Sequence, residues 1–390
     1  MSFPKMKLGE CAEIHSGSTP RTNNPDFWDG DITWVTPKDL SKLKSKFISK
    51  TESKITQLGF DSCSTKLLPE NSVLFSSRAP IGHVAINTIP MCTNQGFKSF
   101  VPKADLLDSQ YLYYWLKANK EYLQDLGVGA TFKEISKTVI ANVEIPLPPL
   151  AEQRRIASIL DQADELRQKR QQAIEKLDQL LQAAFIDMFG DPVSNPKGWN
   201  NCKFENVIEF VTYGLTVRPE YHEQGIPLIS AREIRTGELN YDSSPKISKV
   251  DFEKLSEKAK PKQNDILFSK TGSIGHCAIV KDQRDFAVTQ NAARVVPRVD
   301  VCNPMFLLYF MRTKYFYNLA NKEAKGNAVK DLQLGIMKSF QVYLPPMDLQ
   351  DKWAIFAALI EKQKNKLETS NEEVSNLFKS LQNQAFNGTL

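Results

Sequence analysis

The sequence is poor in the residues and runs that mark several common classes of protein. Its 390 residues include six cysteines, none of them in a CxxC pair, so we expect reduced thiols rather than a disulfide framework or a zinc site. No apolar run reaches the roughly 18–20 residues of a membrane helix. The first residues, MSFPKMKLGE, lack the apolar core of a signal peptide. We therefore expect a cytoplasmic chain without a membrane partner.

Enzyme motifs are missing as well. The sequence has no GxxxxGK[ST], GxSxG, HExxH or GxGxxG motif, and no amino-methyltransferase signature of Asn or Asp followed by Pro-Pro and an aromatic residue. Pro25-Asp26 with Glu52-Ser53-Lys54 loosely matches the PD…ExK arrangement of magnesium-dependent nucleases, but the second half of the chain preserves neither element. We predict no catalytic residue, no metal site and no cofactor in this chain, and keep a self-contained nuclease as an alternative.

The composition is that of a folded protein with a mild basic excess. Hydrophobic residues make up 41% and charged residues 24%, which is normal for globular domains. A length of 390 residues favours two or more domains. The net charge of +5 permits a polyanionic partner without requiring one.

The chain is a tandem repeat. NSVLFSSRAPIGHVAI at 71–86 returns as NDILFSKTGSIGHCAI at 264–279, an offset of 193 residues (264 − 71). A period of this length is too long for a solenoid, so the chain consists of two copies of one module. Other matched stretches are WVTPKDL with LISAREI (34–40 and 228–234) and GATFKE with GNAVKD (129–134 and 326–331).

Each copy ends in the same joint. EIPLPPLAEQRRIASIL at 144–160 reappears as QVYLPPMDLQDKWAIFA at 341–357, so that Pro148 matches Pro345 and Gln153 matches Gln350 at an offset of 197 (345 − 148). A long helical pattern follows each Pro-Pro pair. About 38 residues at ~1.5 Å each make a rod of roughly 55–60 Å.

The helical stretches keep a heptad pattern, which predicts a two-helix coil. We place on its seams, or on faces that meet a partner, Ile156, Ile159, Leu166, Leu177 and Leu180 of the first helix, and Trp353, Phe356, Ile360, Leu367, Val374, Leu377 and Leu381 of the second. The predicted fold class is α+β, with strand-rich domains at 1–147 and 199–344, helices at 148–190 and 345–387, and a linker at 191–198.

Basic and polar loops recur at matched places in the two strand-rich domains, while the residues themselves differ. Arg78 aligns with Thr271, and Lys38 with Arg232. Arginine can read guanine, Gln can read adenine, and Lys, Ser and Thr suit phosphates, although any one of these residues is more often a solvated surface group. The candidate DNA-binding residues are Ser16, Ser18, Thr19, Arg21, Lys38, Ser77, Arg78, Gln95, Thr131 and Lys133 in the first copy, and Tyr213, Arg218, Arg232, Lys270, Thr271, Gln290 and Lys330 in the second.

The joint PLPPLAEQRRIASIL with its echo, the Gly-Ser-Thr-Pro stretch and the pair LFSSRAPIGHVAI and LFSKTGSIGHCAI resemble the specificity subunit of type I restriction–modification systems over the whole length. The second joint departs from the usual PLPPLxEQ pattern. The resemblance implies two target-recognition domains and two antiparallel helices, with pseudo-two-fold symmetry.

The same resemblance implies partners and a target. The partners are double-stranded DNA, two methyltransferase (modification) subunits that dock on the helices, and restriction subunits in the full complex. S-adenosylmethionine, ATP and magnesium belong to those partners. Because the reading loops differ between the copies, we expect an asymmetric bipartite target with an unread spacer. A helical scaffold that never touches DNA is the second alternative.

Overall fold

The computed structural model describes residues 3–129, 133–216 and 219–390. The chain forms two compact units. Unit 1 contains Met1–Gln171 and Thr369–Leu390, and unit 2 contains Gln172–Glu368. Each unit therefore includes one segment of each long helix. No helix in the described ranges carries an apolar stretch long enough to cross a membrane.

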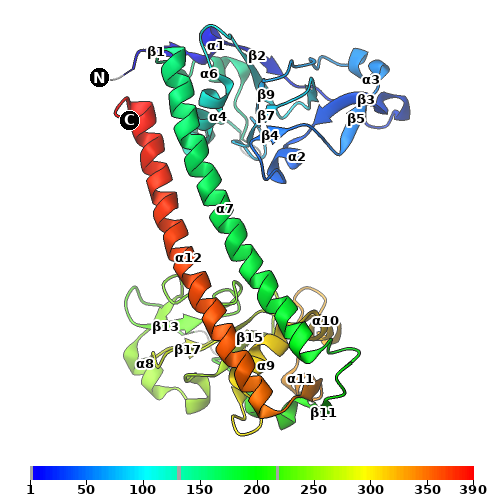
Figure 1. Cartoon of the computed structure of the whole chain (residues 1–390), viewed down its shortest axis with the longest axis vertical. Helices are drawn as coiled ribbons and strands as arrows, with labels where there is room; N and C mark the ends of the chain where they lie inside the picture. Colours follow the sequence, from blue (N-terminus) through cyan, green and yellow to red (C-terminus); the bar gives the residue numbers. More distant parts are fainter. Residues whose placement is uncertain (1–2, 130–132, 217–218) are drawn as a thin grey trace. The chain divides into compact units, whose positions relative to one another are not determined.

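Unit 1 is built on a five-stranded sheet. Its core is formed by Phe75 and Phe100 of the sheet together with the buried residues of α4 (Ser109–Ala118), which lies against β7 (Figure 1). A three-stranded sheet and a two-stranded pair complete the strands. The orders are β2(Ala12–Ser16)-β9(Lys98–Pro102)-β6(Val73–Phe75)-β7(Val84–Asn87)-β4(Phe47–Ile48), β5(Ser53–Ile55)-β3(Trp28–Val35)-β8(Cys92–Thr93) and β1(Lys5–Lys7)-β10(Glu144–Pro146).

Unit 2 repeats this arrangement, with a main sheet of four strands in place of the five in unit 1. In unit 1 the central strand β3 of the three-stranded sheet pairs antiparallel with β5 and parallel with β8. In unit 2 the central strand β13 pairs antiparallel with β14 and parallel with β17. This agreement confirms that the two halves are copies of one fold. The orders are β12(Ile208–Tyr213)-β18(Ala292–Pro297)-β15(Ile266–Ser269)-β16(Cys277–Ile279), β14(Lys246–Ile247)-β13(Ile226–Ile229)-β17(Ala287–Val288) and β11(Asn200–Lys203)-β19(Gln341–Leu344).

Short helices connect the strands. Several of them begin at a side chain that caps their free N–H groups, for example Asp108 before α4 and Asn303 before α9. The bounds are α1 Leu8–Cys11, α2 Pro37–Ser41, α3 Gln57–Asp61, α5 Lys120–Asp125 and α6 Lys137–Ala141 in unit 1, and α8 Lys249–Lys254, α9 Pro304–Met311, α10 Lys314–Glu323 and α11 Leu334–Lys338 in unit 2; single 3-10 turns lie at η1 Pro25–Phe27, η2 Phe204–Asn206 and η3 Glu257–Ala259.

The two long helices are α7 (Leu150–Phe189) and α12 (Met347–Asn387). In unit 1 the guanidinium of Arg167 lies 5.5 Å from the ring centre of Phe378, and Arg170 hydrogen-bonds Ser370. Partner numbers fall as α7 numbers rise, so the two segments run antiparallel.

Within unit 2 the second pair of segments shows the same direction. Asp178 and Lys364 form an ion pair of 2.7 Å, and the rings of Phe185 and Trp353 meet at 5.1 Å between centroids. Both units thus contain paired antiparallel segments of α7 and α12, as the predicted fold class requires.

One seam of the predicted heptad is displaced by one residue. Leu166, Leu180 and Leu377 are 46%, 45% and 57% exposed, whereas Leu181 and Phe378, the next residues after Leu180 and Leu377, are buried, as is Leu160 next to Ile159 of the same seam. A step of one residue turns a helix by about 100°, which moves a side chain from the buried to the open face. The assignment of Leu166, Leu180 and Leu377 to the coil was therefore wrong. The other seam includes the fully buried Ile156 and Trp353, with Leu177, Ile360, Leu367, Val374 and Leu381 half-buried, and Ile159 and Phe356 of the displaced seam are half-buried as well.

The Pro-Pro joint is tied to its domain by a fully buried glutamine. In unit 1 the amide of Gln153 donates to the carbonyl oxygens of Leu106 and Pro148, both at 2.8 Å, and accepts from the N–H of Asp108 at 2.9 Å. In unit 2 Gln350 makes the equivalent bonds, which run to Pro345, Val301 and Asn303. The repeated sequence therefore builds the same joint twice.

Candidate nucleic-acid interface

In unit 1 the loop that follows β2 lies against the loop that precedes β9. The N–H of Ser18 donates to the carbonyl of Thr93 at 3.0 Å, the N–H of Gly17 donates to that of Phe97 at 3.3 Å, and Thr19 hydrogen-bonds the side chain of Gln95. Sequence positions almost eighty residues apart (|i−j| = 76) are thereby brought together. Ser16, Arg21 and Gln95 are exposed at this junction, and Ser18 and Thr19 are half-exposed.

Glycine is required at this junction in both units. A Cβ atom on Gly17 would lie 1.9 Å from the carbonyl oxygen of Asn94, and one on Gly214 would lie 1.7 Å from that of Val288. Both distances are far below any real contact, and the obstructing atoms are backbone. The aligned glycines of the two copies therefore permit the same close approach of two loops.

A third loop of unit 1 joins the same cluster. The N–H of Ser77 donates to the carbonyl of Gly96 at 2.8 Å, and the carbonyl of Ser77 accepts from the N–H of Ile135 at 3.0 Å. Arg78 forms a β-bridge with Glu134, whose neighbour Lys133 is exposed. The structure thus brings together the candidates from four separate segments.

Lys38 and Arg232 occupy equivalent turns. In unit 1 the N–H of Thr36 donates to the carboxylate of Asp39 at 2.8 Å, and in unit 2 the N–H of Ser230 donates to that of Glu233 at 2.9 Å. The turn places Lys38 in solvent, with its side chain 67% exposed and 3.1 Å from Glu52. Arg232 is also exposed.

The corresponding loops of unit 2 assemble in the same way. The N–H of Gln290 donates to the carbonyl of Leu215 at 2.9 Å, and the N–H of Lys270 donates to that of Asn291 at 3.1 Å. The carbonyl of Lys330 accepts from the N–H of Gly272 at 2.9 Å. Tyr213, Gln290 and Lys330 are exposed and Thr271 is half-buried.

Two candidate side chains are turned inward. Ser77 is fully buried, and its hydroxyl donates to the carbonyl of Gly96 at 3.2 Å, so this side chain holds a loop and does not face a ligand. Lys270 is only 9% exposed, and its ammonium is paired with Asp331. Lys270 was predicted as a DNA-binding candidate, and in the structure the carboxylate covers its ammonium. Thr131 and Arg218 lie outside the described residues.

Three charged residues of the cluster were missed. Lys98 lies in β9 and is 6% exposed, and its ammonium is 3.1 Å from the carboxylate of Glu134. In unit 2 the acid at the matched position is Asp331. An acid at the last position of both GATFKE and GNAVKD is the sequence signal for Glu134 and Asp331.

The nuclease-like match has another explanation. Glu52 is paired with Lys42 and Lys38, and the hydrogen bonds from these two ammonium groups lower the pKa of its carboxyl. Its oxygens are therefore engaged by cations of the chain itself. Across residues 3–129, 133–216 and 219–390, no three His, Cys, Asp or Glu side chains are grouped so that they could hold a metal ion.

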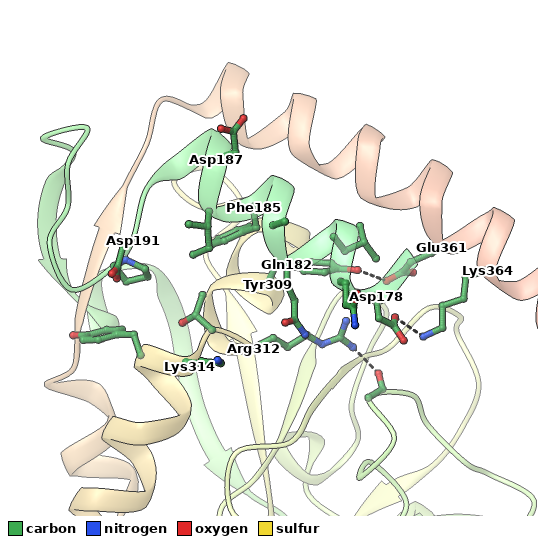
Figure 2. A pocket seen from close by; sticks show the side chains of 18 of the residues that line it. Asp178, Gln182, Phe185, Asp187, Asp191, Tyr309, Arg312, Lys314, Glu361 and Lys364 are labelled. Carbon is green, nitrogen blue, oxygen red and sulfur yellow. Dashed lines mark hydrogen bonds and ion pairs between the residues drawn. The ribbon is translucent and has the colours of Figure 1, made fainter. Parts of the chain in front are cut away.

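Unit 2 also contains a pocket of about 1110 Å³, shown in Figure 2. Several of its charged side chains are paired with one another or with backbone, among them Lys364 with Asp178, and Arg312 with the carbonyl of Gly237 at 2.6 Å. The hydroxyl of Tyr309 donates to Glu361 at 3.1 Å, and burial raises the pKa of that tyrosine well above its ordinary value. This chemistry suits the packing of α7 and α12 rather than catalysis.

The chain belongs to the family described as the type I restriction modification DNA specificity domain, because the model of that family matches residues 2–176 and again residues 196–374. The family occurs twice in the chain, in agreement with the repeat.

Among its relatives, the MjaIX specificity subunit of a type I restriction enzyme of Methanocaldococcus jannaschii is 29% identical over 383 residues, covering 92% of this chain and 88% of the relative. The EcoBI specificity subunit of Escherichia coli is 25% identical, covering 77% of this chain and 70% of the relative.

Solved structures show the same fold. The S subunit of a type I restriction–modification system from M. genitalium has a TM-score of 0.59 at 14% identity, with 99% of this chain and 96% of that chain covered. A chain from a study of assembly and conformational transition in a type I R-M system also scores 0.59, at 17% identity, with 100% and 98% covered.

Proposed function

We propose that this chain is the sequence-specific DNA-binding subunit of a type I restriction–modification complex, in which each unit reads one half of an asymmetric bipartite target. One observation carries the proposal: the two units repeat the same framework and the same loop contacts, while the exposed side chains on those loops differ. Arg78 corresponds to Thr271, and Lys38 to Arg232. Equal frameworks with different reading groups suit two different half-sites.

The exposed candidates divide by chemistry. Arg78, Arg232, Gln95 and Gln290 have planar groups that can make paired hydrogen bonds with base edges. Lysines and hydroxyls suit phosphate oxygens, which fix register without reading sequence. We assign phosphate contacts to Ser16, Ser18, Thr19, Lys38, Lys133 and Lys330, and keep Arg21, Tyr213 and Thr271 as further candidates at the same faces.

The chain itself is non-catalytic, and its partners supply the chemistry. We infer that two modification subunits, with S-adenosylmethionine, dock on α7 and α12, and that restriction subunits with ATP and magnesium complete the complex, in the cytoplasm where the DNA lies. Each helix offers exposed apolar side chains, which favour a protein partner. They are Leu166, Leu180 and Ile186 of α7, and Ile355, Leu359 and Leu377 of α12.

The proposal is tested with this chain assembled with its modification subunits. We expect methylated adenines in the host genome at one bipartite motif with two unlike halves, and a gel shift that is selective for DNA carrying both halves. A complex that binds DNA without selectivity, or not at all, would support the scaffold alternative. Cleavage of DNA by the isolated chain with magnesium would support the nuclease alternative.

A further inference from the structure

Both units carry a carboxylate in the middle of the loops assigned to DNA. In unit 1 one oxygen of Glu134 is 3.1 Å from the ammonium of Lys98, and the other is 3.9 Å from the guanidinium of Arg78. In unit 2 Asp331 pairs with the ammonium of Lys270 and accepts a hydrogen bond from the hydroxyl of Thr271. An acid at a face that meets phosphates reduces attraction for DNA. Because an acid occurs at the matched position in both units, we infer that it has a role other than attraction.

The two lysines paired with these acids lie in or next to different strands of the repeat. Lys98 comes from β9 and Lys270 follows β15, and their side chains are only 8% and 11% exposed. A buried ammonium without a partner is costly. The matched carboxylates therefore meet the same need in two different local sequences.

The backbone of each acid closes a loop. Glu134 exchanges two N–H···O bonds of 3.0 Å with Val128, and Asp331 exchanges bonds of 2.8 and 3.0 Å with Lys325. Each acid is also bridged to the neighbouring reading loop, at Arg78 in unit 1 and at Thr271 in unit 2. The exposed Lys133 directly precedes Glu134, and the exposed Lys330 directly precedes Asp331.

We propose that Glu134 and Asp331 are positioning residues of the two reading faces: each fastens the loop it closes to the neighbouring reading loop and fixes the cations beside it. This inference rests on the proposed function. Charge-assisted hydrogen bonds are shorter and stronger than neutral ones, and such bonds hold Lys98 in unit 1 and Lys270 and Thr271 in unit 2. Arg78 is held by its backbone bridge and the ion pair of 3.9 Å. Groups fixed before binding lose less entropy on binding. The acids therefore lower the general attraction for DNA and raise the selectivity for the correct half-site.

Removal of the negative charge should separate these two effects. With Glu134→Gln the face gains positive charge, so binding to random DNA should stay equal or become tighter. The cognate complex should lose about 5- to 150-fold in affinity, the range of a single base-reading contact, and base changes within one half-site should be tolerated. Asp331→Asn should relax the other half-site only.

Matched variants control for charge and for folding. Glu144→Gln makes the same charge change on the exposed edge of β10, and it should leave both half-sites selective. Glu134→Asp keeps the charge with the residue type that unit 2 uses, and it should retain most of the selectivity. The double variant Lys98→Met with Glu134→Gln removes the buried cation together with its partner, so it should recover thermal stability but not selectivity.

The measurement is the affinity of the assembled complex for the cognate target, for targets altered in either half, and for random DNA, together with the melting temperature of each variant. If the wild-type complex shows no selectivity for the cognate target, the proposed function itself is overturned. A selective wild type with an equally selective Glu134→Gln variant would overturn the positioning role alone. Recovery of both stability and selectivity in the double variant would reduce Glu134 to a structural counter-ion of Lys98.

Discussion

Gln153 accepts a hydrogen bond from the backbone N–H of Asp108 at 2.9 Å, at the point where α7 leaves the Pro-Pro pair. Asp108 itself caps α4. One amide therefore connects the first turn of the long helix to the first turn of the helix that fills the core of unit 1. Gln350 makes the same connection to Asn303, which caps α9 in unit 2.

Replacement of this amide should loosen the joint. Gln153→Met preserves length but leaves the N–H of Asp108 and the carbonyls of Leu106 and Pro148 without their partner. One unsatisfied buried group costs about 1–3 kcal/mol. Hydrogen exchange of the α4 amides should report this loss of protection. The exposed Gln162→Met on the same helix is the control, and equal exchange rates in the two variants would contradict the joint.

The neighbours Leu180 and Leu181 should behave in opposite ways. Leu181 is 3% exposed and belongs to the core of unit 2, whereas Leu180 is 45% exposed. Leu181→Ala should cost about 2–5 kcal/mol of stability. Leu180→Ala should change stability by no more than about 0.5 kcal/mol and should weaken capture of the modification subunit. Urea unfolding and pull-down of that subunit measure the two effects, and the reverse result would restore the original heptad assignment.

Arg78→Ala and Arg232→Ala should each relax one position of the target, in opposite halves. A base-reading arginine contributes about 1–3 kcal/mol, whereas loss of a phosphate contact weakens binding to all sequences and makes the salt dependence shallower. Competition assays with single-base variants at two salt concentrations distinguish these outcomes. An equal loss of affinity for all sequences would mean that the arginine contacts phosphate rather than a base.

The close loop contacts predict that alanine is not tolerated at Gly17 or Gly214. A Cβ there would press on backbone atoms, and strain of this kind costs typically about 1–3 kcal/mol or more. Gly17→Ala should disturb selectivity for one half-site and Gly214→Ala for the other. Gly335→Ala in α11 meets no atom within 4 Å, and it should keep or slightly raise the melting temperature because alanine favours helix.

The length of the paired helices should set the unread spacer. Seven residues inserted into α7 after Gln171 and seven into α12 after Glu368 preserve the heptad and add about 10 Å of helix, which corresponds to roughly three base pairs at ~3.4 Å each. We expect methylation at a motif with the same halves and a longer gap. An unchanged gap would separate spacer length from helix length.

Features of the fold that depend on local sequence could be predicted from the repeat. Which side of a helix or loop faces the core could not. The repeat aligned Thr36 with Ser230, and the backbone N–H of each donates to the carboxylate of an acid three residues further on. The second heptad seam was misplaced because leucines lie at both Leu180 and Leu181, and periodicity does not say which of them meets α12 and which meets solvent or a partner.

The reading face shows the same division. Its loops were identified by their matched polar residues, but Ser77 and Lys270 point inward, where the hydroxyl of Ser77 bonds the carbonyl of Gly96 and the ammonium of Lys270 pairs with Asp331. The ion pair of Lys98 with Glu134 joins positions 36 residues apart. No local pattern connects these two residues, so only the folded chain reveals the pair.

The make-up of unit 1 has a consequence for biosynthesis. Phe378 and Ala385 of α12 are buried in its core beside Tyr111, although more than 250 residues separate them from it along the chain. Unit 2 is one uninterrupted segment and can complete its core while translation continues. Unit 1 is made first, but part of its apolar interior stays uncovered until α12 has been synthesised, so we expect unit 1 to depend more on chaperones than unit 2 does.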